Sequence, residues 1–448
     1  MHFIGIGGAG MSALARILID KGYEISGSDM KNSPVVEQLR QKGARIFMGH
    51  SAPNLGGAEA IVVSSAISET NPEIVAAGEK GLKRFHRSDI NAALLNAAKG
   101  IAVAGAHGKT TTTSMTGVVL DYAGLKPTII IGGEVDYLGG NARLGEGEYL
   151  VSEADESDGS FLKLRPHIAI VTNIEDDHMD YYGTMENIRR AFREFMENTD
   201  RETGRVVACF DNENIRNIAA SLDRQVISYA IDHEADYQAV DIEPQGTGIS
   251  FAVKYRGNIL GRIVLNIPGR HNVLNALAAT ATALLCGAGF EQIAEAFSVF
   301  HGAKRRFETK GRRNGVWVVD DYAHHPTEIA STLAAARQTS AKRIICAFQP
   351  HRYTRTQLLQ REFGGAFGGA DILVLTDIYP AGEAPIDGVD GHLIEKAVAE
   401  ASGRQAVYIA ERSDIAGYLK GIVREGDLVI TMGAGDIFRT GAELLSQL

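Results

Sequence analysis

A glycine-rich segment with a lysine and two threonines is the strongest chemical signal in the sequence. It consists of Gly105, Ala106, His107, Gly108, Lys109, Thr110 and Thr111. Backbone N–H groups of such a loop surround phosphate oxygens, while Lys109 reaches the outer phosphates and the Thr110 hydroxyl binds magnesium. The general phosphate-loop pattern has a glycine where this chain has Val103. The alternative is a glycine turn before a threonine-rich helix, but the apolar strand before the segment favours a nucleotide.

Two acidic clusters follow later strands of the same series. Residues 152–158 follow the predicted strand Tyr149–Val151, and residues 173–180 follow the strand His167–Val171. The carboxyl ends of parallel strands share one edge of a sheet, so we expect both clusters beside the glycine-rich loop. Magnesium prefers hard oxygen ligands, so we expect one ligand from each cluster. The other acids are then solvated caps and turns.

A second glycine loop stands near the N-terminus. Residues 5–10, Gly-Ile-Gly-Gly-Ala-Gly, fit G-x-G-x-x-G, and Asp29 ends the second predicted strand as a possible ribose partner. Alone, this pattern indicates a nicotinamide or flavin dinucleotide site. The pattern indicates that the backbone of the loop approaches a phosphate group, but it does not identify the ligand that carries the phosphate. A structural turn that binds no ligand remains the alternative.

Two further polar loops directly follow strands in the C-terminal third. They are residues 320–326, which include His324 and His325, and residues 349–355. Arg352 and Arg355 stand three residues apart in the second loop and can fork onto a carboxylate or a phosphate. A solvated basic surface loop is the alternative.

Short β-type runs alternate with helical patterns, which predicts α/β architecture with parallel sheets covered by helices. The first series has strands at His2–Ile4, 23–29 and Ala60–Val63 and a helix over 11–18, and the second begins at Ile101–Ala104. Alternation over Ile249–Tyr255 before Gly257 predicts an antiparallel hairpin appended to the central domain.

A third series follows a predicted loop over 311–315. Its strands are expected at Val316–Val319, Arg343–Ala347, Ile372–Leu375 and Leu428–Thr431. The 448 residues suit three domains at roughly 150 residues each. We place them at 1–92, 93–309 and 310–448: a Rossmann-like N-terminal domain, a central phosphate-loop ATPase domain with a mostly parallel sheet plus a small antiparallel part, and a C-terminal Rossmann-like α/β domain.

Composition excludes several classes of protein. The net charge of -10 argues against sequence-independent binding of nucleic acid. Cys209, Cys286 and Cys346 lie far apart without C-x-x-C spacing, which argues against a disulfide framework or a thiolate zinc site and favours a reducing, cytoplasmic setting. No apolar run approaches the roughly 18 residues that cross a bilayer, and no signal peptide is predicted, so we expect no membrane insertion.

Taken together, these motifs resemble the Mur ligase family, and the resemblance runs from Phe3 to the end of the chain. The matching segments are 5–11, 64–67, 105–113, 153–158, 175–180, 269–272 with 275–276, 304–307, 321–326 and 351–356. Ala106 departs from the family loop, which usually has Thr there. Because loop backbone does most of the phosphate binding, we expect little loss from this change.

The resemblance implies ATP-dependent formation of an amide between L-alanine and the carboxylate of UDP-N-acetylmuramate through an acyl phosphate, in peptidoglycan precursor synthesis. It implies ATP and two magnesium ions as cofactors and a monomer or homodimer. Carried over by position, Lys109 holds the outer phosphates of ATP, and Thr110, Glu153 and His178 ligate magnesium. Histidine is an unusual magnesium ligand, so the place of His178 rests on the resemblance.

The remaining site residues are also implied by the resemblance. His271 and Asn272 would contact adenine, and Arg305 or Arg306 the phosphates of ATP. The alanine carboxylate would be held by His351, Arg352 and Arg355, with His324 and His325 close by. The UDP portion would be bound by Gly7, Gly8, Ala9, Gly10, Met11, Ser28, Asp29, Ser64, Ser65 and Ala66. No residue is assigned as the base that accepts the amine proton.

Three rival functions remain open. A related recycling ligase attaches a whole peptide to the same sugar, and other Mur-type ligases use other amino acids. A nicotinamide dehydrogenase would explain residues 5–10 and Asp29 but leaves the Lys109 loop and the acidic clusters unexplained. A nucleotide-sensing regulator would bind ATP and release no phosphate.

Overall fold

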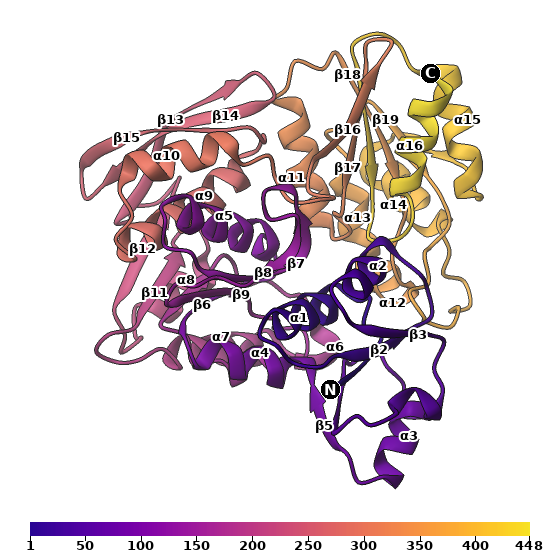
Figure 1. Ribbon diagram of the computed structural model, residues 1–448. Helices are drawn as coiled ribbons and strands as arrows, with labels where there is room; N and C mark the ends of the chain where they lie inside the picture. The colour runs from indigo at the N-terminus through magenta and orange to yellow at the C-terminus, as the bar shows by residue number, and fades with distance from the viewer. The chain divides into compact units, whose positions relative to one another are not determined.

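The computed structural model describes the backbone of residues 1–448 and all side chains except that of Asp180, so this acid of the second cluster lies outside the described side chains. The contacts divide the chain into two units. The first is Met1–Val240 with Ala252–Ile263 and Leu274–Phe300, and the second is Asp241–Phe251 and Val264–Val273 with His301–Leu448. Over these residues the chain forms a five-stranded, a ten-stranded and a six-stranded sheet (Figure 1).

The first sheet is parallel and has the order β3-β2-β1-β4-β5. Its strands are β1 His2–Ile4, β2 Ser26–Asp29, β3 Arg45–Met48, β4 Ala60–Val63 and β5 Lys83–His86, and its helices are α1 Ala9–Asp20, η1 Ala52–Leu55, α2 Pro34–Gln41, α3 Pro72–Glu79 and α4 Arg87–Asn96. Strand order reverses at β1, which lies between β2 and β4. In such sheets, the carboxyl ends at the reversal point form the ligand crevice.

The second sheet has the order β15-β14-β13-β12-β11-β10-β6-β9-β7-β8. The strands are β6 Lys99–Ala104, β7 Thr128–Val135, β8 Gly140–Arg143, β9 Tyr149–Glu153, β10 Ile168–Val171, β11 Arg205–Cys209, β12 Val226–Ala230, β13 Tyr237–Gln245, β14 Gly248–Tyr255 and β15 Asn258–Leu265. The helices are α5 Lys109–Tyr122, η2 Asp136–Leu138, η3 Ser160–Lys163, α6 Met179–Tyr182, α7 Met185–Glu197, α8 Glu213–Ala219, α9 Arg270–Leu285 and α10 Phe290–Val299. Strand β6 lies between β10 and β9, and both pairings are parallel.

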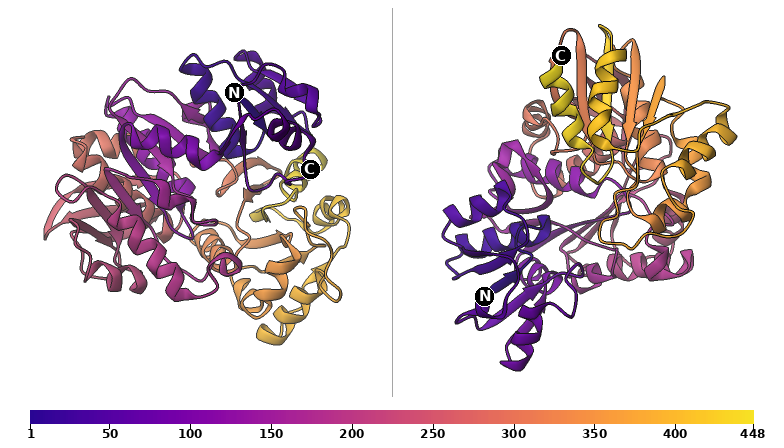
Figure 2. Two further views of the ribbon diagram at one scale, coloured as in Figure 1. Left: turned by 90° about the horizontal axis from the view of Figure 1, so that it is seen from below. Right: turned by 90° about the vertical axis from the view of Figure 1, so that its right-hand side faces the viewer.

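The third sheet has the order β16-β17-β21-β18-β19-β20 and is parallel except for its edge strand β16. The strands are β16 Glu308–Arg313, β17 Val316–Asp321, β18 Arg343–Phe348, β19 Ile372–Leu375, β20 Val407–Tyr408 and β21 Asp427–Met432, and the helices are α11 Pro326–Arg337, α12 Tyr353–Leu358, α13 Gln360–Ala366, α14 His392–Ser402, α15 Arg412–Ile422 and α16 Phe438–Gln447. Trp317 and Val319 enter one apolar cluster and Val316 and Val318 another. Both faces of this sheet are therefore buried under helices, as the right-hand view in Figure 2 shows.

The predicted fold class is confirmed: three α/β domains with mostly parallel sheets and a small antiparallel part. Two local predictions are wrong. The second strand begins at Ser26, after residues 23–25, and residues 311–313 belong to β16 rather than to a loop. Charged side chains disguise β16, but an edge strand is held by backbone pairing and tolerates them. A search of the described residues finds no helix long and apolar enough to cross a membrane.

Candidate active site

The N-terminal glycine loop spans residues 5–8, between β1 and α1. The N–H groups of Gly5 and Ile6 donate to the Ser28 carbonyl at 2.8 and 3.0 Å, and Gly7 N–H donates to Asp29 Oδ2 at 2.8 Å. A Cβ on Gly7 would lie 2.8 Å from Val36 Cγ2 and 2.9 Å from Asp29 Oδ2. Position 7 therefore favours glycine, because the Val36 and Asp29 side chains lie close to its Cα. The hydrogen bonds to Ser28 and Asp29 hold the loop at the end of β2.

The predicted UDP-binding residues come together at the carboxyl ends of β1, β2 and β4. The turn at 64–67 follows β4, and its Ile67 side chain lies 3.0 Å from the Cβ position of Gly5. Ala9, Gly10 and Met11 form the first turn of α1 rather than part of the loop. The Met11 side chain is buried in the core, so only its backbone belongs to this edge.

The central glycine loop, residues 105–108, is held by the end of β10. His107 N–H donates to Asn173 Oδ1 at 2.8 Å, and Thr172 Oγ1 donates to the His107 carbonyl at 2.6 Å. A Cβ on Gly105 would lie 2.0 Å from Thr172 Oγ1, and Gly108 has φ +82°. Each glycine has a positive φ, and a Cβ at either position would meet a close neighbour, Thr172 at Gly105 and Asn275 at Gly108, so both positions favour glycine.

Lys109 opens helix α5 and its side chain folds back over this loop. Its ammonium donates to Glu156 Oε1 at 2.6 Å, to the Ala106 carbonyl at 3.1 Å and to the Gly105 carbonyl. Burial raises the pKa of Glu156 to about 7, against the opposing effect of Lys109. Burial alone would lower the pKa of Lys109, but the charge and hydrogen bond of Glu156, together with the charges of Asp155 and Glu153, raise it. The loop thus carries one buried ionisable pair.

Asp155 also belongs to the first acidic cluster, but it makes a structural contact. Its carboxylate pairs with Arg87, the first residue of α4. Burial raises the pKa of Asp155, but Arg87 and hydrogen bonds from Ser157 outweigh it and bring the pKa to about 2. This ion pair joins the end of the N-terminal sheet to the loop after β9.

Glu153 and Thr110 both lie against the two glycines of β7. Gly132 N–H donates to Glu153 Oε1 at 2.6 Å. A Cβ on Gly132 would lie 2.9 Å from Glu153 Oε2, and one on Gly133 would lie 3.2 Å from Thr110 Cγ2. The absence of side chains here makes room for the Glu153 carboxylate and the Thr110 methyl group. A carboxylate and a threonine hydroxyl are hard oxygen donors of the kind that Mg²⁺ prefers, so these two residue types fit that ion.

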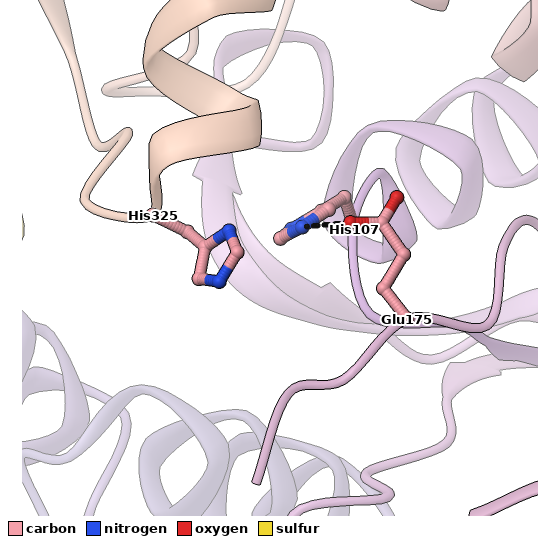
Figure 3. A group of neighbouring side chains, drawn as sticks. All are labelled: His107, Glu175 and His325. Atoms are coloured by element: carbon pink, nitrogen blue, oxygen red, sulfur yellow. Dashed lines mark ion pairs between the residues drawn. The ribbon is translucent and has the colours of Figure 1, made fainter. Parts of the chain in front are cut away.

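His178 and Glu175 show how the second acidic cluster contacts the site. His178 has a left-handed backbone with φ 56°, and its Nε2 lies 3.5 Å from Asp177 Oδ2 and 3.7 Å from Glu156 Oε1. Glu175 pairs with Nε2 of His107 at 3.3 Å, the dashed contact in Figure 3. As expected, both acidic clusters lie at the edge that carries the glycine loop.

In the second unit, three of the predicted alanine-binding residues cluster. The rings of His324 and His351 have centroids 5.8 Å apart, His351 stacks on Tyr379, and an Arg355 guanidinium nitrogen lies 3.3 Å from His351 Nδ1. Burial lowers the pKa of His324 to about 4 and that of His351 to about 3. Both rings are therefore neutral at pH 7. Of these three residues, Arg355 carries the positive charge.

Arg352 and His325 flank this cluster. Arg352 has φ 71° and its guanidinium lies 3.9 Å from Glu383 Oε1. His325 is buried and precedes helix α11 as its N-cap. Glu383 also accepts a hydrogen bond from Thr354 Oγ1 at 2.7 Å, so it fixes the start of α12 beside Arg352.

Arg305 and Arg306 have different surroundings. Arg305 donates to Asp320 Oδ2 at 3.0 Å and to the Gly433 carbonyl, with its guanidinium over the Tyr322 and Phe438 rings. Arg306 also lies over Tyr322, 5.2 Å from the ring centroid, and pairs with Glu328. Both arginines therefore have partners inside the C-terminal domain.

The predicted adenine residues begin helix α9. Burial lowers the pKa of His271 to about 4, and Arg306 acts in the same direction. Asn272 is buried and donates to the Pro268 carbonyl at 2.7 Å. His271 is thus a neutral ring within reach of the charge of Arg306.

Sequence reasoning missed three features that shape the site. They are the Lys109 partner Glu156, the loop anchor Asn173, and the paired glycines 132–133. Glu156 stood within a predicted cluster, but nothing in its spacing separated it from Glu153. The glycine pair inside an apolar strand run was the one local signal that could have been used, since strand glycines mark close approach.

Protein-family models match almost the whole chain. They are the Mur ligase family catalytic domain over residues 1–99, the Mur ligase middle domain over 103–283, and the Mur ligase glutamate ligase domain over 305–435.

Similar sequences and structures extend over full length. UDP-N-acetylmuramate–L-alanine ligase of Pelotomaculum thermopropionicum is 51% identical, covering 100% of this chain and 97% of that protein, and the enzyme of Desulforamulus reducens is 49% identical with the same coverage. Among solved structures, UDP-N-acetylmuramate-alanine ligase of Thermotoga maritima has TM-score 0.86 at 30% identity over 100% and 98% of the two chains. A murein peptide ligase of Psychrobacter arcticus has TM-score 0.75 at 27% identity over 99% and 98%.

Proposed function

Because this chain belongs to the Mur ligase family, we propose that it is the ATP-dependent ligase that joins L-alanine to UDP-N-acetylmuramate in peptidoglycan precursor synthesis, releasing ADP and phosphate. The full-length relatives that carry this name support the choice of L-alanine over a whole peptide. A cytoplasmic location accords with these substrates, and a monomer or homodimer is proposed.

The observation that carries the proposal is the buried Lys109–Glu156 pair above the central glycine loop. A triphosphate needs backbone donors, a cation and a magnesium site at one place. The end of the loop at Gly108 with the first turn of α5, Lys109 Nζ, and the oxygens of Glu153 and Thr110 would supply these three parts. A dinucleotide-dependent dehydrogenase has no use for this arrangement.

The chemistry explains why a carboxylate needs ATP before an amine can attack it. A carboxylate carbon is electron-rich, and its leaving group would be oxide. Transfer of the γ-phosphoryl group to the carboxylate makes an acyl phosphate, whose leaving group is phosphate. The alanine amine then attacks through a tetrahedral intermediate, and Lys109 steadies the charge on the phosphoryl group during transfer.

Thr110 and Glu153 would hold one Mg²⁺, and His178 a second. When bound, Mg²⁺ neutralises phosphate charge and holds the phosphates in place for transfer. Glu153 is already oriented for this task by Gly132 N–H, while His178 stands beside Glu156. The UDP portion is assigned to the N-terminal loop with Ser28, Asp29 and 64–66, and the alanine carboxylate to His351, Arg352 and Arg355 with His324 and His325.

Phosphate release from ATP tests the proposal. Purified protein with MgATP and UDP-N-acetylmuramate is given each amino acid in turn, or the intact murein tripeptide. Release that depends on both the sugar nucleotide and L-alanine is the expected result. Release only with the peptide would assign the recycling reaction, and no release with any acceptor would overturn the ligase function.

A further inference from the structure

A glutamate that no motif singled out lies buried behind the N-terminal glycine loop. Glu73 is in the first turn of α3, after its N-cap Asn71, and its side chain is fully buried. A buried carboxylate is costly unless every oxygen accepts hydrogen bonds, so its partners define what it does.

The Glu73 carboxylate joins separate segments of the N-terminal sheet. Oε2 accepts from Ser28 Oγ at 2.5 Å and lies 3.3 Å from His50 Nδ1 and 3.6 Å from His2 Nε2. Oε1 accepts from Asn54 Nδ2 at 2.6 Å and from the Ser51 N–H at 3.2 Å. One side chain thus links α3, the start of β1, the end of β2 and the segment after β3.

Three groups donate hydrogen bonds to the carboxylate: the Ser28 hydroxyl, Asn54 Nδ2 and the Ser51 N–H. An ionised glutamate accepts all of them. His50 Nδ1 lies 2.9 Å from Ser28 Oγ. Burial alone would raise the pKa of Glu73, but the contacts with His2, Ser28, Asn54 and Ser51 lower it to about 2.

Ser28 also contacts the glycine loop directly. Its carbonyl accepts the N–H groups of Gly5 and Ile6, and the next residue, Asp29, accepts the N–H of Gly7. Glu73 therefore contacts the side chain of Ser28, and the backbone of Ser28 contacts the loop. Among the described side chains, Glu73 and His50 are the hydrogen-bond partners of the Ser28 hydroxyl, and His50 Nδ1 also lies 3.3 Å from Glu73 Oε2.

We propose that Glu73 is a positioning residue for binding of the sugar nucleotide: through Ser28 it holds the loop at residues 5–8 in the geometry that receives the diphosphate. This inference rests on the proposed function, which assigns the loop to UDP-N-acetylmuramate. Glu73 itself touches no substrate and takes no part in phosphoryl transfer.

Steady-state kinetics of Glu73→Gln test the inference. The amide has the same shape, but its NH₂ group meets donors in either orientation, so either Ser28 or the Asn54 and Ser51 donors lose their acceptor and the cluster is disrupted. We expect the KM for the sugar nucleotide to rise about tenfold, while kcat and the KM for ATP stay within about twofold. Glu73→Asp keeps the charge and is expected to recover part of the loss. An unchanged sugar-nucleotide KM in Glu73→Gln would overturn the proposal.

Two further proteins separate positioning from general destabilisation. Ile74→Val removes one buried methylene from the same helix and is expected to lower the melting temperature without changing any KM. Ser28→Ala removes the middle link, so the double variant Glu73→Gln with Ser28→Ala should be no worse than the more affected single variant. Additive losses, or a raised KM in Ile74→Val, would count against the proposal. If Glu73→Gln does not fold, Glu73→Asp and Ser28→Ala carry the same comparison.

Failure of the inference and failure of the proposed function are distinguishable. If the unaltered protein shows no L-alanine-dependent phosphate release, the proposed function is wrong. If that activity is present and Glu73→Gln has a normal sugar-nucleotide KM, only the role of Glu73 is wrong.

Discussion

The two glycine loops occupy the same position in their sheets but have opposite electrostatics behind them. Each follows a central parallel strand, leads into a helix and is backed by a buried glutamate. The pKa of Glu73, behind the N-terminal loop, is lowered to about 2, because hydrogen bonds outweigh burial. The pKa of Glu156, behind the central loop, is raised to about 7 by burial. The geometry of a glycine-rich loop alone therefore does not distinguish a loop that only binds a phosphate from one that takes part in phosphoryl transfer.

The difference lies in the partners of each carboxylate. Both oxygens of Glu73 accept hydrogen bonds, one from the Ser28 hydroxyl and the other from Asn54 Nδ2 and the Ser51 N–H. Glu156 has one oxygen on the Lys109 ammonium, and among the described residues its Oε2 has no hydrogen-bond partner. A fully bonded carboxylate suits a loop that only holds its ligand. The Lys109 ammonium would instead exchange its hydrogen bonds to Glu156 and to the Gly105 and Ala106 carbonyls for a phosphoryl group in transfer.

The largest expected effect comes from Lys109→Ala, which removes the cation from the central loop alone. We expect kcat to fall by about a thousandfold, since the transferring phosphoryl group loses its charge partner. Binding of UDP-N-acetylmuramate, measured by calorimetry, should be unchanged because the contacts proposed for this substrate lie on the other loop. Loss of sugar-nucleotide binding in this variant would contradict the division of labour between the loops.

Gly108→Ala is expected to have the next largest effect. Its φ of +82° is strained for alanine, and the new Cβ would lie 2.7 Å from Asn275 Oδ1. We expect a loss of about 1–3 kcal/mol in the free energy of unfolding, measured with urea, and a higher KM for ATP. Gly124→Ala is the matched control, because Gly124 has φ +81° with nothing within 4 Å of its Cβ. A control as destabilised as Gly108→Ala would show that strain, not contact, decides.

Gly8→Ala examines the other loop and should show the reverse pattern. Gly8 has φ -61°, and the nearest atom to its Cβ position is the Gly5 carbonyl oxygen at 3.4 Å. The free energy of unfolding should change by less than about 1 kcal/mol. The KM for the sugar nucleotide should rise about tenfold, because the methyl group occupies space where backbone meets phosphate. An unchanged KM for the sugar nucleotide in Gly8→Ala would mean that its diphosphate does not bind at this loop.

A further expected effect is a change in the pH dependence of stability. The folded-state pKa of Glu73 is about 2 against an ordinary value of 4.5. Its contribution to stability is therefore present above about pH 4.5 and is lost as the pH falls toward 2. Urea unfolding at pH 7, 5, 4 and 3 should show Glu73→Gln less stable than the unaltered protein at pH 7, with the difference shrinking below pH 4.5. His2 and His50, which face the carboxylate, are present in both proteins. A difference that stays constant with pH would contradict the lowered pKa.

Much of the architecture was predictable because buried parallel strands are continuous apolar runs. β4 and β19 match their predicted ranges, and the polar loops that follow β1, β6, β9, β10, β17 and β18 carry the expected site residues. The strand-end rule then places both acidic clusters beside the Lys109 loop.

The predictions failed where backbone pairing or long-range contact decides. β3, β5 and β16 carry charged residues yet form strands, because their neighbours in the sheet supply hydrogen bonds regardless of side chain. Glu73 and Glu156 look like any surface acid in the sequence. Their burial depends on partners such as Ser28 and Lys109 that lie 45 and 47 residues away.

The dependence of the central loop on β10 has a consequence for the order of folding. Val171 pairs with Ala104, and Thr172 and Asn173 then hold His107, so the loop acquires its shape only after two strands far apart in sequence have met. Such non-local pairings form late, since loop-closure entropy opposes them. Nucleotide affinity should therefore appear in the last kinetic phase of refolding, after most helical signal has returned, which makes ATP a reporter of completed sheet assembly.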